Sequence, residues 1–275
     1  MAITAMTEQL ELLGKDLYKS TPGVITIRQL PTSSELEYVG SEDFDKVMLE
    51  KILPTAIEET VDFEELLEID YQWILRCLRI LNYGPYHTTN SIFCSDCGKA
   101  NYGEYRVNLN TVECKPLPDG FVNDIVVTAD EFIDFDGDIH LKLPTIRSMM
   151  NAMKDKAFQR ADGTINRGFA RLCYMIKSVK DKTGLTPVEI KLLIQNELSS
   201  ADFIILEEVA SNLVDYGLRA GGHCVCPNCG SKNGAFLALI DDKFFRPTLG
   251  DLREWKHDRR AGADKDVSGT ATNAV

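Results

Sequence analysis

Two matched cysteine motifs, with 128 residues (98–225) between them, constrain the fold of this chain more than any other feature. Both read Cys-x-x-Cys-Gly; the first contains Cys94 and Cys97, and the second contains Cys226 and Cys229. Each motif supplies two thiolates, whereas a structural zinc site takes four ligands in a tetrahedron. The sequence therefore predicts one four-cysteine Zn²⁺ site per chain, built from two distant segments that the metal holds together.

The residues around the cysteines indicate a turn followed by a strand in both motifs. Gly98 and Gly230 follow the second cysteines and permit the positive φ that such turns often need. Strand-like segments come next, over Tyr102–Leu109 and Ala235–Ile240. This repeated layout is typical of a zinc ribbon. A zinc ion bound only by cysteines has no open coordination position, so we expect the metal to be structural and not catalytic.

Other uses of these cysteines fit the sequence less well. A Cys-x-x-Cys pair can be a thioredoxin-like redox centre, but neither motif has the required βαβ context. Disulfides need an oxidising compartment, and residues 1–13 lack the basic start and apolar core of a signal peptide. Cys77 and Cys173 lie in apolar helical patterns, and we expect them to be small core residues. His223 and Cys224 remain open as substitute ligands beside the second motif.

Length and charge limit the classes of protein that this chain can represent. Its 275 residues suffice for one large domain or two small ones, and no apolar run approaches the ~20 residues of a membrane span. The net charge is −12, with 13 acidic residues against two lysines over Glu35–Asp70 and a surplus of +7 over Lys142–Lys182. These segments are either solvated faces or surfaces that meet within the chain or between neighbours. Nucleic-acid binding is disfavoured by the sign of the total charge.

Hydrophobic patterns predict an α+β fold. In the N-terminal third we expect a helix over Thr7–Leu17 and a strand over Gly23–Arg28 that forms a hairpin with Glu35–Val39. A helix capped by Ser41 would follow towards Glu59, with a kink or break at Pro54. The next helix would run from about Asp62 to a stop at Tyr83-Gly84-Pro85.

The middle of the chain is expected to be mainly helical. The Asp-Gly turn within Phe132–Leu143 predicts a β-hairpin, because its spacing does not match a calcium loop. Four helices should follow, over Ile146–Phe158, over Asn166–Val179, from a capping box at Thr186 to Leu198, and from Ser200 to Gly217.

These patterns suggest four parts. They are an N-terminal hairpin with acidic helices (1–90), a zinc-clasped β unit (91–143 with 218–250), a four-helix insertion between the two cysteine motifs (144–217) and a disordered tail (261–275). Catalytic patterns are missing: none of the four histidines lies in an H-E-x-x-H context, and no phosphate-binding glycine loop or nucleophile elbow occurs. We therefore expect a protein that is not an enzyme.

The order of several short motifs resembles the baseplate proteins of contractile-tailed bacteriophages, of the T-even hub and hub-assembly type. The matching segments are Leu30-Pro31-Thr32 with Tyr38, Leu78–Tyr86, Phe93–Cys97, Val107–Leu109, Leu117–Phe121, Gly137 with Ile139–Thr145, and Phe244–Pro247. The resemblance extends over most of the chain, from about Leu30 to Pro247. Each motif is short, so their order carries the resemblance.

The resemblance implies a virion protein of the tail baseplate, or a factor that assembles hub and wedge subunits in the host cytoplasm. Phe244-Phe245-Arg246-Pro247 is then a candidate docking anchor, with burial of at least one phenylalanine as the competing interpretation. Two other classes remain as alternatives: a zinc-ribbon protein that binds nucleic acid or acts in transcription, and a redox enzyme that uses one Cys-x-x-Cys pair.

Overall fold

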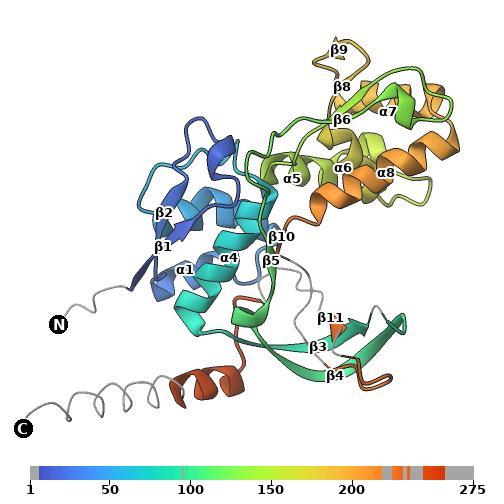
Figure 1. The fold of residues 1–275 in the computed structure, drawn as a ribbon. Coiled ribbons are helices and arrows are strands. Elements are labelled where there is room, and N and C mark those ends of the chain that lie inside the picture. Colours follow the sequence, from blue (N-terminus) through green and yellow to red (C-terminus); the bar gives the residue numbers. More distant parts are fainter. Residues whose placement is uncertain (1–5, 95, 219–224, 232–233, 236–243, 258–275) are drawn as a thin grey trace, which may run out of the picture.

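The computed structural model describes residues 6–94, 96–218, 225–231, 234–235 and 244–257. Helices and strands are mixed, which confirms the broad α+β class. The buried side chains form two hydrophobic clusters. The first lies mainly in the described residues of 6–115 and 217–257, which we call the proximal lobe, and also includes Ile146 and Met150. The second lies mainly in residues 116–216, which we call the distal lobe (Figure 1).

The proximal lobe begins with a two-stranded sheet. β1 (Thr7–Glu11) pairs antiparallel with β2 (Val24–Arg28), so that Leu10 lies opposite Ile25 and both are buried. The predicted strand at β2 is confirmed, whereas the helix predicted over Thr7–Leu17 is wrong over β1. Pairing with β2 fixes β1 as a strand, and Leu10 is the one residue of its five that is buried. The predicted hairpin partner of β2 is also wrong, because that segment lies in helix α1 (Thr32–Tyr38).

The acidic segment then forms a short, irregular helical stretch. It comprises α2 (Phe44–Val47), a π-helical turn (Met48–Ile52) and α3 (Leu53–Ala56). Asp43, and not Ser41, caps α2, since its side chain accepts from the Lys46 N–H. Pro54 lies in the first turn of α3, which ends at Ala56, three residues before the predicted Glu59. Pro54 has no N–H, and the π-turn directly before it accommodates the lost α-helical hydrogen bond.

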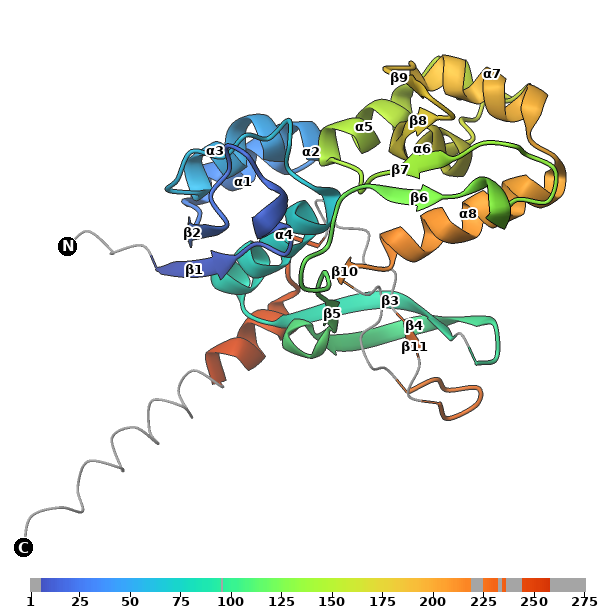
Figure 2. The same cartoon turned by 45° about the horizontal axis from the view of Figure 1, so that its top comes forward.

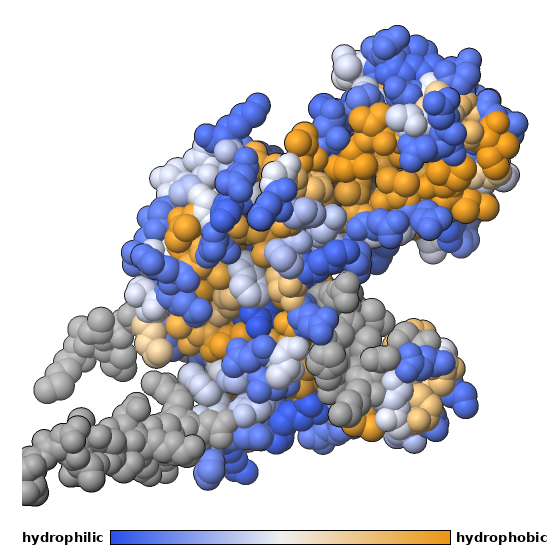
Figure 3. All heavy atoms as spheres, in the orientation of Figure 1, coloured by the Kyte–Doolittle hydropathy of each residue, from blue (hydrophilic) through white to orange (hydrophobic). Residues whose placement is uncertain are grey.

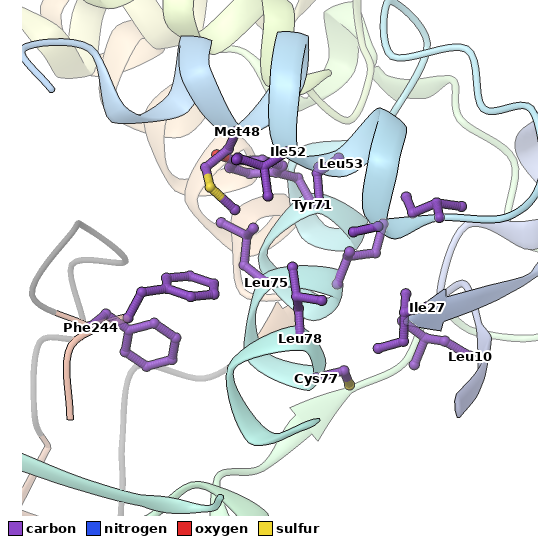
Figure 4. Packing of buried hydrophobic residues seen from close by; sticks show 14 of the residues in the cluster. Leu10, Ile27, Met48, Ile52, Leu53, Tyr71, Leu75, Cys77, Leu78 and Phe244 are labelled. Carbon is purple, nitrogen blue, oxygen red and sulfur yellow. The ribbon is translucent and has the colours of Figure 1, made fainter. Parts of the chain in front are cut away.

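The long helix α4 (Glu68–Tyr83) forms the centre of the proximal lobe. It starts six residues after the predicted Asp62 and ends, as predicted, at Gly84, whose φ is +79°. Leu75 and Leu78 of α4 pack towards Met48 and Ile52, with Phe244 on the neighbouring side of the helix (Figure 4). Because residues from both ends of the chain meet on α4, this helix joins the N-terminal segments to the C-terminal one.

A β-hairpin projects from the end of α4. β3 (Tyr86–Cys94) and β4 (Lys99–Asn108) are antiparallel, and β11 (Gly234–Ala235) adds to β3, giving the strand order β11-β3-β4. The chain then enters the distal lobe through β5 (Cys114–Lys115) and leaves it through β10 (Gly217–Leu218), and these two segments pair with each other. Figure 1 shows the hairpin below the β5–β10 neck, and Figure 2 shows it below the distal lobe.

The distal lobe is a four-stranded antiparallel sheet with four helices. The strands are β6 (Ile125–Val127), β7 (Ile139–Leu141), β8 (Ile176–Val179) and β9 (Lys182–Thr183), in the order β6-β7-β8-β9. The helices are α5 (Ile146–Lys154), α6 (Arg167–Met175), α7 (Pro187–Glu197) and α8 (Ser200–Val214). This sheet unites strands from both sides of residue 143, where the sequence placed a boundary between two parts of the chain.

Two of the sequence predictions for the distal lobe are corrected. The hairpin over Phe132–Leu143 is wrong in its first half, because β7 pairs with β6, while Phe132 and Phe135 form a buried edge-to-face pair. The helix predicted over Asn166–Val179 ends at Met175, where the chain turns into β8. Val179 and Ile176 are buried in the sheet, so tertiary pairing overrides the helical pattern. The capping box at Thr186 is confirmed.

The acidic and basic segments meet within the chain. Three basic residues of the distal helices form ion pairs with the proximal lobe. Arg147 pairs with Glu64 at 3.0 Å and with Glu50 at 3.9 Å, Arg171 pairs with Glu68 at 2.5 Å, and Lys154 pairs with Asp43. Two further basic residues of the Lys142–Lys182 segment, Lys177 and Lys180, pair with carboxylates inside the distal lobe. The acidic and basic segments, which are separate in the sequence, therefore form ion pairs that contribute to the contact between the two lobes.

The C-terminal part returns to the proximal lobe. Phe244 and Phe245 are both buried in its core, so the interpretation of these rings as an exposed docking anchor is wrong. A helical segment (249–257) follows, and Thr248 caps it by accepting from the Asp251 N–H. Within the described residues, no helix combines the length and apolar character that crossing a membrane requires.

Candidate metal centre

The β3–β4 hairpin positions the first cysteine motif at its tip. β3 ends at Cys94 and β4 begins at Lys99, so Cys97 lies in the connecting turn. The second motif comes shortly before β11 in the sequence, and β11 pairs with β3 in a register that sets Gly234 opposite Cys94. Backbone pairing beside the cysteines thus brings together two motifs that are 128 residues apart in the sequence.

The four predicted cysteines form one cluster. All four Sγ atoms lie within 4.8 Å of one another, with 3.6 Å between Cys94 and Cys229 and 3.8 Å between Cys97 and Cys226. A Zn–S bond of ~2.3 Å gives a tetrahedron with edges of ~3.8 Å, so these separations match zinc coordination by four thiolates. They are nearly twice a disulfide bond of ~2.05 Å, and all four thiols are free.

Both motifs have the backbone that the sequence predicts. Gly98 has a φ of +63° and Gly230 a φ of +71°, which confirms the left-handed conformation expected after each second cysteine. In the second motif the Gly230 N–H donates to the Cys226 carbonyl at 2.8 Å and closes the turn. A side chain with a Cβ at either glycine would be strained at this φ, although neither position is crowded. The requirement for glycine is therefore conformational and not steric.

Hydrogen bonds to sulfur and between the motifs surround the cluster. The buried Asn101 of β4 donates through Nδ2 to Cys226 Sγ at 3.5 Å, and Asn228 donates to Asn101 Oδ1. The Ser231 hydroxyl donates to Asp96 at 2.5 Å, which joins the second motif to the first. Such outer contacts orient metal ligands and favour the thiolate form. Asn101 was missed by the sequence reasoning, because nothing in its local pattern marks it as a partner of a residue 125 positions away.

The electrostatics of the cluster favour release of the first proton at Cys226. Burial opposes ionisation of this thiol, but the backbone N–H groups of Cys229 and Asn228 and the neighbouring thiols lower its pKa to about 6. By contrast, burial raises the pKa of Cys77 and of Cys173 to about 12. Both of these cysteines are buried in hydrophobic clusters, which confirms that they are core residues. The substitute ligands His223 and Cys224 lie outside the described residues.

The cluster has the chemistry of a closed metal site. Four sulfur donors satisfy the usual coordination number of zinc and leave no position for a water or substrate. Cys94 and Cys226 are fully buried, whereas Cys229 is exposed, so one edge of the cluster faces solvent. No family model, curated protein or solved structure matches this chain.

Proposed function

We propose that the four cysteines hold one structural Zn²⁺ per chain and form a zinc ribbon with the strands β11-β3-β4. The observation that carries this proposal is the spacing of the sulfurs at the edges of a ZnS₄ tetrahedron. The strand that follows the second motif pairs with the strand that leads into the first. Zinc would therefore fasten the C-terminal part of the chain to the hairpin and contribute directly to folding.

Elemental analysis of purified protein tests the metal site. Wild type should contain one zinc per chain, and Cys97→Ser and Cys229→Ser should each lose it, because each removes one of four ligands. Cys114→Ser is the matched control, since this half-buried thiol lies outside the cluster and should leave the zinc content unchanged. Two zinc ions per chain, or full zinc content in either ligand variant, would be incompatible with a shared site.

We further propose that the protein is a non-enzymatic component or assembly factor of a phage tail baseplate. Support comes from the ordered motifs between Leu30 and Pro247 and from a metal site without an open coordination position. The internal pairing of basic residues argues against the alternative of nucleic-acid binding, since at least five of the ten in Lys142–Lys182 are engaged by carboxylates.

Fractionation of phage assembly tests the baseplate role. Antibodies against the protein should detect it in purified tails or in baseplate intermediates separated on gradients from infected cells. Its absence from all tail-related fractions would refute the proposal. A mobility-shift titration with DNA and RNA at low salt distinguishes the alternative, for which salt-sensitive binding is expected.

A further inference from the structure

The distal lobe carries an apolar trough between α6 and α8. Two hollows of about 370 and 270 Å³ adjoin there, since Gly168 and Glu207 line both of them. Figure 3 shows hydrophobic side chains gathered over this side of the distal lobe. The apolar lining residues are Phe169, Leu172, Met175, Ile194, Leu198 and Phe203. The exposed Ile204 lies next to this lining on α8.

Gly168 has no role in the packing of the chain itself. It lies in the first turn of α6, where a residue with a Cβ would lose less conformational entropy on folding. A Cβ at this position would meet no atom within 4 Å, and its φ lies outside the left-handed region. On the opposite wall, Ala210 and Ser211 are also small. The side chains at the centre of the trough are therefore small, which leaves room for another backbone to approach.

The dimensions of the trough fit a short helix. Residues of α8 from Ser200 to Ser211 line the two hollows, a span of ~17 Å at a rise of 1.5 Å per residue. A helix of three turns has the same length. Helices bind in such grooves through apolar residues at positions i, i+3 or i+4, and i+7. Close contact between two helices at 8–10 Å requires small residues where the axes cross, as Gly168 and Ala210 provide.

The charge of the trough is negative at its centre. Among the residues that the structure describes, no ion pair or hydrogen bond engages the Glu207 side chain, which lines both hollows. Arg171, the basic residue in the lining, is already paired with Glu68. A symmetric contact with a second copy along α8 would bring the two Glu207 carboxylates towards each other. The complementary occupant is therefore a different chain that carries lysine or arginine at this point.

We propose that this trough binds an amphipathic helix of about three turns from a partner protein. Its apolar face would lie on Phe169 and Phe203, its backbone would pass closest to Gly168, and a lysine or arginine would face Glu207. The distal lobe has its own sheet and hydrophobic cluster, so this binding site does not depend on the proposed zinc centre.

Selection from a displayed library of random 14-residue peptides against the full-length protein tests the proposal. Enriched peptides should share apolar residues at helical spacing and carry lysine or arginine. Their affinity should fall at least tenfold for Gly168→Leu, which fills the space, and for Glu207→Lys, which reverses the charge. Glu208→Lys is the matched control, because Glu208 is exposed on the same helix but lines neither hollow, and affinity should stay within twofold.

Circular dichroism and thermal unfolding establish that the variants are folded. Gly168→Ala should keep or raise the melting temperature of the protein while lowering the affinity for the peptides. A glycine with a purely structural role would not produce this combination. A library that yields no such peptides, or peptides that bind Gly168→Leu as tightly as wild type, would overturn the proposal. Self-association in sedimentation experiments that Gly168→Leu abolishes would also overturn it, because the occupant would then be a second copy.

Discussion

The Arg79 guanidinium donates from Nε to the backbone carbonyl of Phe244 at 2.8 Å, across 165 residues of sequence. Its other nitrogens donate at 2.7 Å to the carbonyls of Gly84 and Tyr86, so one buried side chain joins the end of α4, the start of β3 and the C-terminal segment. Burial lowers the pKa of Arg79 to about 10, and the group remains protonated at neutral pH. The three hydrogen-bond acceptors of the Arg79 guanidinium are all backbone carbonyl groups, and none is a carboxylate.

Replacement of Arg79 by lysine should destabilise the protein by about 3 kcal/mol. Lysine keeps the charge but cannot reach three carbonyls in fork geometry, and each buried group left without a partner costs ~1–3 kcal/mol. Urea unfolding of Arg79→Lys measures this loss. Arg160→Lys, on an exposed arginine, is the control and should change stability by less than ~0.5 kcal/mol. Equal stabilities of the two variants would contradict the role of Arg79 as a tie between segments.

Asp70 should make the stability of the proximal lobe depend on pH. Burial raises the pKa of this carboxyl above its usual 3.8, although it accepts from the Leu13 and Gly14 N–H groups and the Tyr18 hydroxyl. Because the folded pKa exceeds the unfolded one, the contribution of Asp70 is greatest below pH 3.8 and declines as pH rises through the folded value.

The comparison of wild type with Asp70→Asn isolates this effect. The free energy of unfolding of wild type minus that of the variant should decrease as pH rises from ~3.5 to ~7, on top of a constant offset from the altered hydrogen bonds. Measurement of denaturant unfolding at a series of pH values checks the slope. A difference that increases with pH would show that the hydrogen bonds outweigh burial and that the folded pKa is lowered.

Removal of the metal should loosen one part of the molecule selectively. A strong chelator should increase amide hydrogen exchange in β3 and β4, because the second motif and β11 lose their attachment to the hairpin. The helices α7 and α8 should keep their protection, since they belong to the second hydrophobic cluster. The chelator already saturated with Zn²⁺ serves as the control. Uniform loss of protection in both lobes would contradict a local metal clasp.

The ion pairs between the lobes should differ in strength according to their burial. The Arg171–Glu68 pair has side chains 33% and 14% exposed, whereas Glu64 in the Arg147–Glu64 pair is 68% exposed. Burial raises the pKa of Glu68, and Arg171 acts in the opposite direction. Double-mutant cycles with alanine should give a coupling of ~1–2 kcal/mol for the first pair and below ~0.5 kcal/mol for the second. The reverse order would exclude burial as the cause.

Several predictions from the sequence succeed because their causes are local. The end of α4 at Gly84, the capping box of α7 at Thr186 and the positive φ of Gly98 depend on residues within a few positions of each other. The prediction that the four cysteines gather in one place also succeeds, because the chemistry of a shared metal requires it.

The failures share a physical cause in contacts between distant residues. The segment Ile176–Val179 continues the helical pattern of α6, but pairing with β7 and burial of Val179 make it a strand. The amphipathic pattern of Thr7–Leu17 predicts a helix, whereas Thr7–Glu11 forms β1, whose pairing with β2 buries only Leu10 among its five residues. In both cases the partner strand determines the conformation, and a local pattern contains no information about that partner.

By itself, the sequence determined which four cysteines gather, because one metal requires four ligands. It also determined their turns and several helix ends, such as the end of α4 at Gly84 and the start of α7 at Thr186, because these depend on residues close together in the chain. Only the tertiary structure decided which strands pair, that the acidic and basic segments face each other between the lobes, and that Phe244 and Phe245 are buried in the core, with Arg79 bonded to the Phe244 carbonyl. These outcomes depend on the free energy of burying surfaces from distant parts of the chain together. The segments gain this free energy only when they are in contact in the folded protein.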